Sequence, residues 1–115
     1  MLLDLQTLTE LYPDPAGRRQ FLRRAMEILR DDRQDLQRAL AGRACERAGD
    51  LAHRLQGSVA FLTGQPEQAA AILHPLSRAI KQGLPAGSRL DQDAALEHLR
   101  KLEAVIEKTV GELGL

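Results

Sequence analysis

The side chain with the clearest chemical potential in this sequence is the imidazole of His53, within the run LAHRLQGSVAFLTG (51–64). Apolar and small residues recur around it at steps of three and four, the spacing of one core-facing stripe on a helix. The stripe comprises Ala44, Ala48, Leu51, Leu55, Ser58 and Leu62. At about 100° per residue, His53 lies about 200° from Leu51 and from Leu55, so the ring is predicted to point into water. A neutral imidazole keeps a lone pair on one nitrogen, and it can attack phosphorus and hold the phosphoryl group covalently.

Gly57, one turn after His53, leaves the predicted surface around the ring bare, as does Gly49 one turn before it. A glycine inside a helix costs about 1 kcal/mol relative to alanine. Two interpretations fit this pattern. In the first, Gly57 removes the side chain that would block a protein partner from reaching His53. In the second, Gly57 allows a neighbouring helix to pack closely, and His53 is an ordinary surface histidine.

Other kinds of chemistry have less support. His74 and His98 lie on different predicted helices from His53, with no paired ligand spacing, so no metal site is predicted. A glycine-rich phosphate loop followed by lysine is absent, so we expect no intrinsic ATP-dependent kinase activity. Cys45 is the single cysteine, which excludes an internal disulfide and favours a reducing compartment.

The run His53-Arg54-Leu55-Gln56-Gly57-Ser58 resembles the phosphorylation motif of histidine-containing phosphotransfer (HPt) domains, His-x-Leu-Lys-Gly-Ser/Ala. These domains serve multistep two-component signalling. Ala52 before the histidine also matches the family. The sequence departs from the motif at Gln56, where the family carries lysine, and the glycine that ends the following apolar run stands one place late, at Gly64.

The resemblance implies a phosphorelay intermediate. On this hypothesis His53 accepts a phosphoryl group from the phospho-aspartate of a response-regulator receiver domain and passes it to another receiver. The partners would be receivers of a hybrid sensor histidine kinase and of a downstream regulator. No cofactor is implied in this chain, because the acidic pocket and Mg²⁺ belong to the receiver. Transfer then needs mainly positioning and charge compensation.

Each residue of the motif has an expected role on this hypothesis. His53 is the phosphoacceptor through Nε2, and Gly57 clears the approach. Gln56 hydrogen-bonds a phosphoryl oxygen but adds no positive charge. Arg54, about 100° round the helix, bends across to replace part of the missing lysine's charge. Asp50 has two open roles, as the acceptor of the Nδ1 proton or as a solvated carboxylate that mildly repels the phosphoryl group.

Two further functions remain as alternatives. In one, the protein is a helical docking module that binds receiver or kinase domains without taking phosphate, and His53 is dispensable. In the other, it is a structural helical protein that self-associates through a large exposed apolar face. Ser58 lies on the core stripe, so we expect its hydroxyl to bond to local backbone instead of phosphate.

Five helices are predicted to position His53. The first is capped by Asp4 and runs to about Leu11, and the second begins at Asp14 and Pro15 and runs to about Ala41, where Gly42 ends it. The third runs from about Arg43 to Leu62. The fourth begins at Pro66, and Pro75 is expected to kink or split it; the fifth runs from about Asp91 to Leu113. Short loops make neighbouring helices antiparallel. The sequence therefore predicts one all-α domain over residues 1–115, an antiparallel up-down-up-down four-helix bundle with a short extra N-terminal helix.

The second predicted helix combines an apolar stripe with many charges. Its core residues are expected to be Leu22, Ala25, Leu29, Asp32, Leu36 and Leu40, widened by Phe21, Met26, Ile28 and Ala39. Seven arginines lie between Arg18 and Arg38 among interleaved acidic residues. We interpret them as a solvated face of ion pairs three or four residues apart.

Composition limits the remaining possibilities. A chain of 115 residues suits one domain. Its 16 basic and 16 acidic residues argue against a nucleic-acid binder driven by net charge. No apolar run approaches the ~20 residues that span a bilayer, and no signal peptide is recognisable at the N-terminus. We therefore expect a cytoplasmic protein. Its length fits both a free-standing protein and a domain of a hybrid sensor kinase, and these two alternatives stay open; a monomer is the default for this architecture.

Overall fold

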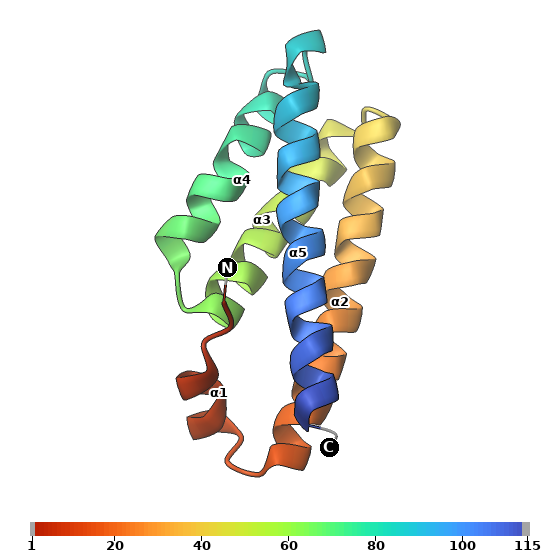
Figure 1. The fold of residues 1–115 in the computed structure, drawn as a ribbon. Coiled ribbons are helices and arrows are strands. Elements are labelled where there is room, and N and C mark those ends of the chain that lie inside the picture. The colour runs from red at the N-terminus through yellow and green to blue at the C-terminus, as the bar shows by residue number, and fades with distance from the viewer. Residues whose placement is uncertain (1, 114–115) are drawn as a thin grey trace.

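The computed structural model describes residues 2–113, and every regular element in that range is helical, so the fold is all-α as predicted. The elements, drawn in Figure 1, are α1 (Leu5–Leu11), α2 (Pro15–Ala41), α3 (Cys45–Thr63), α4 (Pro66–Lys81), the 3₁₀ turn η1 (Ala86–Ser88) and α5 (Arg89–Leu113). Within the described range, no helix combines the length and the apolar character needed to cross a membrane.

The predicted caps begin α1 and α2. The Asp4 carboxylate accepts a hydrogen bond from the backbone N–H of Thr7 at 3.1 Å. The Asp14 carboxylate accepts one from the backbone N–H of Ala16 at 3.4 Å, and Pro15 occupies the first helical position of α2. These bonds pair backbone donors that the first turn of a helix leaves without a partner.

The helix that carries His53 begins two residues later than predicted. Arg43 adopts the left-handed backbone conformation, with φ of 54°, so helical geometry resumes only at Cys45. Gly42 is the C-cap of α2, as expected, but its φ is −84° and the left-handed turn falls on the arginine. The Arg43 guanidinium donates hydrogen bonds to the carbonyl oxygens of Gly83 and Leu84. The loop between α2 and α3 is thereby joined to the loop that precedes α5.

Two other predicted boundaries change. Pro75 lies inside α4, which continues as one helix, so of the two predicted effects, a kink or a split, the split is wrong. Proline removes one backbone hydrogen bond, and burial of Leu73 and Leu76 on either side of it supports the helix there. The last helix begins at Arg89 instead of Asp91, because η1 leads directly into it.

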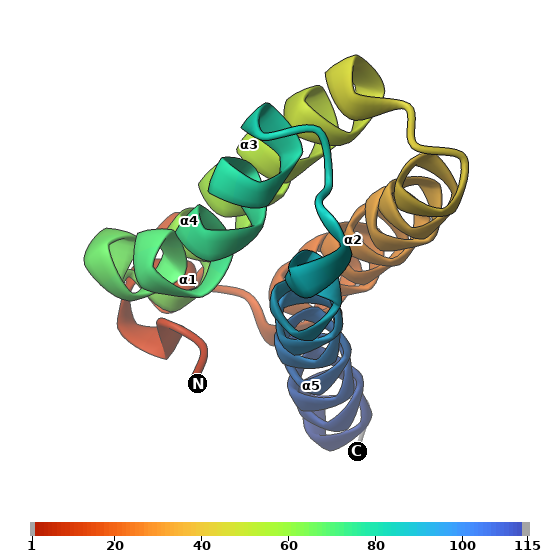
Figure 2. The ribbon, with the colours of Figure 1, turned by 90° about the horizontal axis from the view of Figure 1, so that it is seen from above.

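The long helices pack in adjoining pairs. The most extensive contacts join α3 to α4 and α2 to α5, followed by α2 to α3, whereas α4 and α5 share fewer. Figure 2 shows the pairs from above, and in Figure 1 the chain ascends in α2 and α4 and descends in α3 and α5. The largest fully buried side chains are aliphatic: Leu8, Leu22, Leu29, Leu36, Leu51, Leu55, Leu73, Leu76, Leu99, Leu102 and Ile106.

The polar and apolar faces of α2 differ in part from the prediction. Ile28, expected to widen the core, is 42% exposed. The pairs Arg24–Glu27 and Arg38–Asp35 do lie three residues apart on the surface. However, Arg30 and Arg33 both reach across to Glu103, a buried residue of α5. The arginines of α2 therefore also hold α2 against α5.

The N-terminal segment fixes the end of α3. The backbone N–H of Asp4 donates to the carbonyl of Leu62 at 2.8 Å. Gly64 ends α3 with φ of 66°, and a Cβ atom there would lie 2.5 Å from Asp4 Oδ2. Only glycine suits both the left-handed backbone and the close approach of Asp4.

Candidate functional site

His53 lies on the outer face of α3, as the stripe predicts. Its neighbours Leu51, Ala52 and Leu55 are fully buried, whereas the His53 side chain is exposed. Because these three residues fix the rotation of α3 against the core, the imidazole is held away from the core and into solvent. Within residues 2–113, no hydrogen bond or ion pair joins the His53 ring to another group, so both ring nitrogens are open to solvent or to a partner.

Gly57 has no packing role among the described residues. A Cβ atom built on it would meet nothing within 4 Å, and the residue is exposed. The interpretation that Gly57 lets a neighbouring helix approach is therefore wrong. Gly49 differs, because its Cβ would lie 3.8 Å from Ile80 Cγ2 on α4. A mid-helix glycine that serves no contact within the fold costs about 1 kcal/mol of stability.

Gln56 and Asp50 flank His53 without bonding to it. Gln56 is half-buried and Asp50 is exposed. Among the described residues, Asp50 has no hydrogen bond to the imidazole, so the arrangement favours the solvated role over the tautomer-fixing one. Ser58 donates its hydroxyl to the carbonyl oxygen of Arg54 at 3.2 Å, the local backbone bond that was expected.

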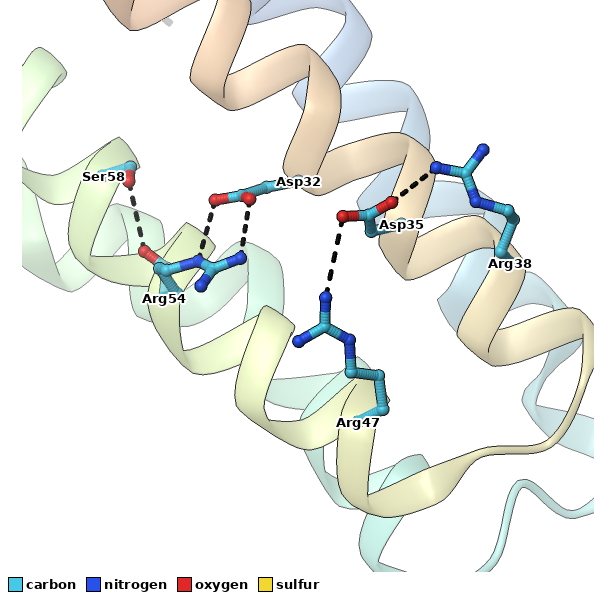
Figure 3. Close-up of polar contacts among 6 residues, drawn as sticks. All are labelled: Asp32, Asp35, Arg38, Arg47, Arg54 and Ser58. Carbon is cyan, nitrogen blue, oxygen red and sulfur yellow. Dashed lines mark hydrogen bonds and ion pairs between the residues drawn. The ribbon is translucent and has the colours of Figure 1, made fainter.

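Arg54, expected near the phosphoryl group, is bound to the neighbouring helix. Its Nε donates to Asp32 Oδ2 at 3.0 Å and its Nη2 donates to Asp32 Oδ1 at 2.7 Å, which is a bidentate pair between α3 and α2 (Figure 3). The Asp32 side chain is 8% exposed and that of Arg54 is 55% exposed. The hydrogen bond to Asp32 and its negative charge raise the pKa of the Arg54 guanidinium.

Two energies decide where the Arg54 guanidinium stays. Removing one partner from a buried ion pair costs about 3–5 kcal/mol, because the other charge is left unpaired. The half-exposed guanidinium puts this pair at the low end of that range. A solvent-exposed pair between an arginine and a carboxylate, the nearest reference for a contact with the phosphoryl group, is worth about 1 kcal/mol or less. Arg54 therefore remains with Asp32 and is not available to a phosphoryl group on His53.

The seam between α2 and α3 changes character along its length. Toward the start of α3, Asp35 pairs with Arg38 on its own helix and with Arg47 of α3 at 3.7 Å (Figure 3). Toward the end of α3 the seam is apolar, and Phe61 and Ile28 are 49% and 42% exposed. These two residues line a groove with Phe21, Arg24, Ala25, Ser58 and Leu62.

The spacing of apolar residues in the sequence did not predict the apolar groove. Phe61 and Ile28 are large apolar residues off the fully buried stripes, and that position off the stripe was the available signal. The ring of Phe21 stacks on Tyr12 with centroids 4.8 Å apart and meets Phe61 edge-on at 6.1 Å. All three aromatic side chains of the protein thus lie in one surface cluster beside α3.

The candidate site therefore consists of an exposed imidazole on α3, open space one turn later and an apolar groove on the flank of the same helix. Across residues 2–113, no three His, Cys, Asp or Glu side chains gather in a way that could hold a metal ion. Comparison of the chain with protein-family models, with curated proteins and with solved structures finds no match.

Proposed function

We propose that this protein is a phosphorelay intermediate of the HPt type, in which His53 accepts a phosphoryl group from a receiver-domain phospho-aspartate and passes it to a second receiver. The observation that carries the proposal is the pairing of an exposed, unbonded imidazole with Gly57, whose missing side chain serves no contact inside the fold. The stability that Gly57 costs α3 is explained if a partner approaches the imidazole from outside the fold, because a side chain at this position would stand in its path. The sequence motif around His53 supports the same reading.

The proposed transfer is a displacement at phosphorus. The lone pair of Nε2 attacks the phosphorus atom, the bond between phosphorus and the aspartate oxygen breaks, and the receiver carboxylate leaves. The Nδ1 proton is then lost to water, which leaves a neutral imidazole ring that carries the phosphoryl group on Nε2. The Mg²⁺ that assists this step belongs to the receiver. This chain holds the imidazole in a fixed direction through the buried neighbours of His53.

The scaffold for this proposal is an up-down-up-down four-helix bundle capped by α1. The contacts of α2 with α3 and α5, and of α4 with α3, support that arrangement. Gly57 leaves the path to Nε2 open, and Gln56 offers a neutral hydrogen bond. The groove lined by Phe61 and Ile28 offers apolar area to a docked receiver. Receivers of this kind act in the cytoplasm, and we propose that the protein works there as a monomer.

The experiment is a transfer assay with a panel of receiver domains. Each receiver is charged with a radiolabelled small phosphodonor and Mg²⁺, then mixed with the protein or with the His53→Gln variant. We expect label on the wild-type protein that survives base, is lost in acid and is absent from the variant. Label that persists in His53→Gln would reject His53 as the acceptor.

One alternative has its own observation in its favour. The exposed aromatic and aliphatic side chains of the groove are suited to docking, whether or not phosphate moves. A docking module that takes no phosphate would bind a receiver with unchanged affinity after His53→Gln and would never acquire label. The transfer assay combined with a binding titration separates the two functions.

A further inference from the structure

The carboxylate that binds Arg54 lies on the neighbouring helix. Asp32 is a buried carboxylate of α2, and both of its oxygens accept hydrogen bonds from the Arg54 guanidinium at 2.7 and 3.0 Å. Arg54 is the residue directly after the proposed phosphoacceptor. Gln56, the other side chain of the motif that could reach a phosphoryl oxygen, is uncharged. The one cationic side chain of the motif, Arg54, is therefore paired with Asp32.

We propose that Asp32 is a positioning residue that holds Arg54 away from the phosphoryl group, so that phospho-His53 is kept labile and its charge is neutralised only by a docked partner. The proposal rests on the proposed function of His53. An aspartate that left this pair would be a buried, unpaired charge, whereas Arg54 would gain only a solvent-exposed contact. Phosphorylation alone is therefore too weak to move the guanidinium.

The consequence concerns the rate at which phospho-His53 loses its phosphate. In hydrolysis, water attacks phosphorus, the N–P bond breaks, and the departing imidazole takes a proton while inorganic phosphate is released. A guanidinium held against the phosphoryl oxygens would disfavour protonation of the imidazole, because like charges repel. Release of Arg54 from Asp32 should therefore lengthen the lifetime of the phosphohistidine.

The test uses the full chain and a chemical donor, so it does not depend on finding the correct receiver. Phosphoramidate transfers its phosphoryl group to imidazole, breaking its own P–N bond and releasing ammonia. After the donor is removed, the half-life of each phosphohistidine is followed by mass spectrometry of peptides. His74 and His98, which are also exposed, provide internal controls in every sample. Circular dichroism confirms that each variant is folded.

The four proteins compared are wild type, Asp32→Asn, Arg54→Gln and the double variant. We expect Asp32→Asn to lengthen the half-life of phospho-His53 about two- to fivefold, the range that an exposed ion pair supplies. The double variant should return to the wild-type value, and Arg54→Gln alone should match wild type. Half-lives at His74 and His98 should not change.

Two results would overturn the inference. One is an unchanged half-life in Asp32→Asn, and the other is a shortened half-life in Arg54→Gln alone, which would mean that Arg54 already contacts the phosphoryl group. If Asp32→Asn does not fold, NMR of the wild-type protein tests the proposal instead, because the solvent exchange rate of the Arg54 Nε–H proton shows whether Arg54 stays bound to Asp32. We expect slow solvent exchange of this proton before and after phosphorylation, and loss of that protection on phosphorylation would refute the proposal.

This design separates the inference from the proposed function. If no receiver labels His53 but the half-lives follow the expected pattern, the relay function fails while the role of Asp32 stands. If receivers label His53 and the half-lives do not follow the pattern, the relay stands and the role of Asp32 is rejected.

Discussion

Replacement of Gly57 by alanine should make the protein more stable and the phosphotransfer slower. Gly57 lies in the interior of α3, is exposed, and has open space where a methyl group would project. Alanine is favoured over glycine in a helix interior by about 0.8–1.0 kcal/mol, and no steric clash offsets this gain. For a domain of this size, that difference should raise the melting temperature by about 3–5 °C. The same methyl group would stand one turn from the imidazole, on the side from which the proposed receiver would approach.

The assays are urea or thermal unfolding and the initial rate of transfer from a charged receiver. We expect the rate to fall by at least about tenfold, because displacement of a docked partner by about 1 Å disrupts in-line geometry. Gly49→Ala is the matched control, since its methyl group would rest near Ile80 on α4 and should stabilise α3 without slowing transfer. A Gly57→Ala protein that is more stable and transfers at the wild-type rate would refute the role given to Gly57. A Gly57→Ala protein that is less stable than the wild type would refute the open space found around Gly57.

Three further outcomes are expected. Gln56→Lys should lengthen the lifetime of phospho-His53 or speed transfer; if both stay constant, Gln56 does not belong to the site. Arg54→Ala should lower the free energy of unfolding by about 3 kcal/mol, against less than about 1 kcal/mol for Arg47→Ala, measured by urea denaturation. If Arg54→Ala and Arg47→Ala lowered the free energy of unfolding equally, the result would contradict the burial of Asp32, the partner of Arg54. The hydrogen bond to Asp32 raises the pKa of Arg54 in the folded protein. The contribution of this pair to the free energy of unfolding is therefore fully present below the ordinary arginine pKa, and it is lost only as the pH rises through the raised pKa of the folded state. The Arg54→Ala loss should therefore be the same at about pH 6 and about pH 10, and a smaller loss at the higher pH would count against this linkage.

Local sequence signals were sufficient where a few neighbouring residues determine the structure. Asp4 located the start of α1, and Asp14 followed by Pro15 located the start of α2. The outward direction of His53 followed from Leu51 and Leu55 alone, because two buried residues on either side fix the rotation of a helix.

Features that join distant parts of the chain were not available from periodicity. Asp32 and Arg54 are 22 residues apart, and Arg33 and Glu103 are 70 apart, so their pairing depends on how the helices pack. Arg54 looked available to a phosphoryl group because Asp32, the carboxylate that holds it, belongs to another helix. The left-handed Arg43 was missed for a related reason, since glycine stood beside it and is the residue that usually takes that conformation.

The aromatic cluster gives the protein a built-in optical reporter. The chain has no tryptophan and one tyrosine, Tyr12, which stacks on Phe21 at the edge of the groove that contains Phe61. Tyrosine fluorescence therefore reports on the surroundings of Tyr12 and does not report on the leucine core. A tryptophan-bearing receiver that docks on the groove would accept energy from Tyr12, so unlabelled binding curves are obtainable from quenching of tyrosine emission alone.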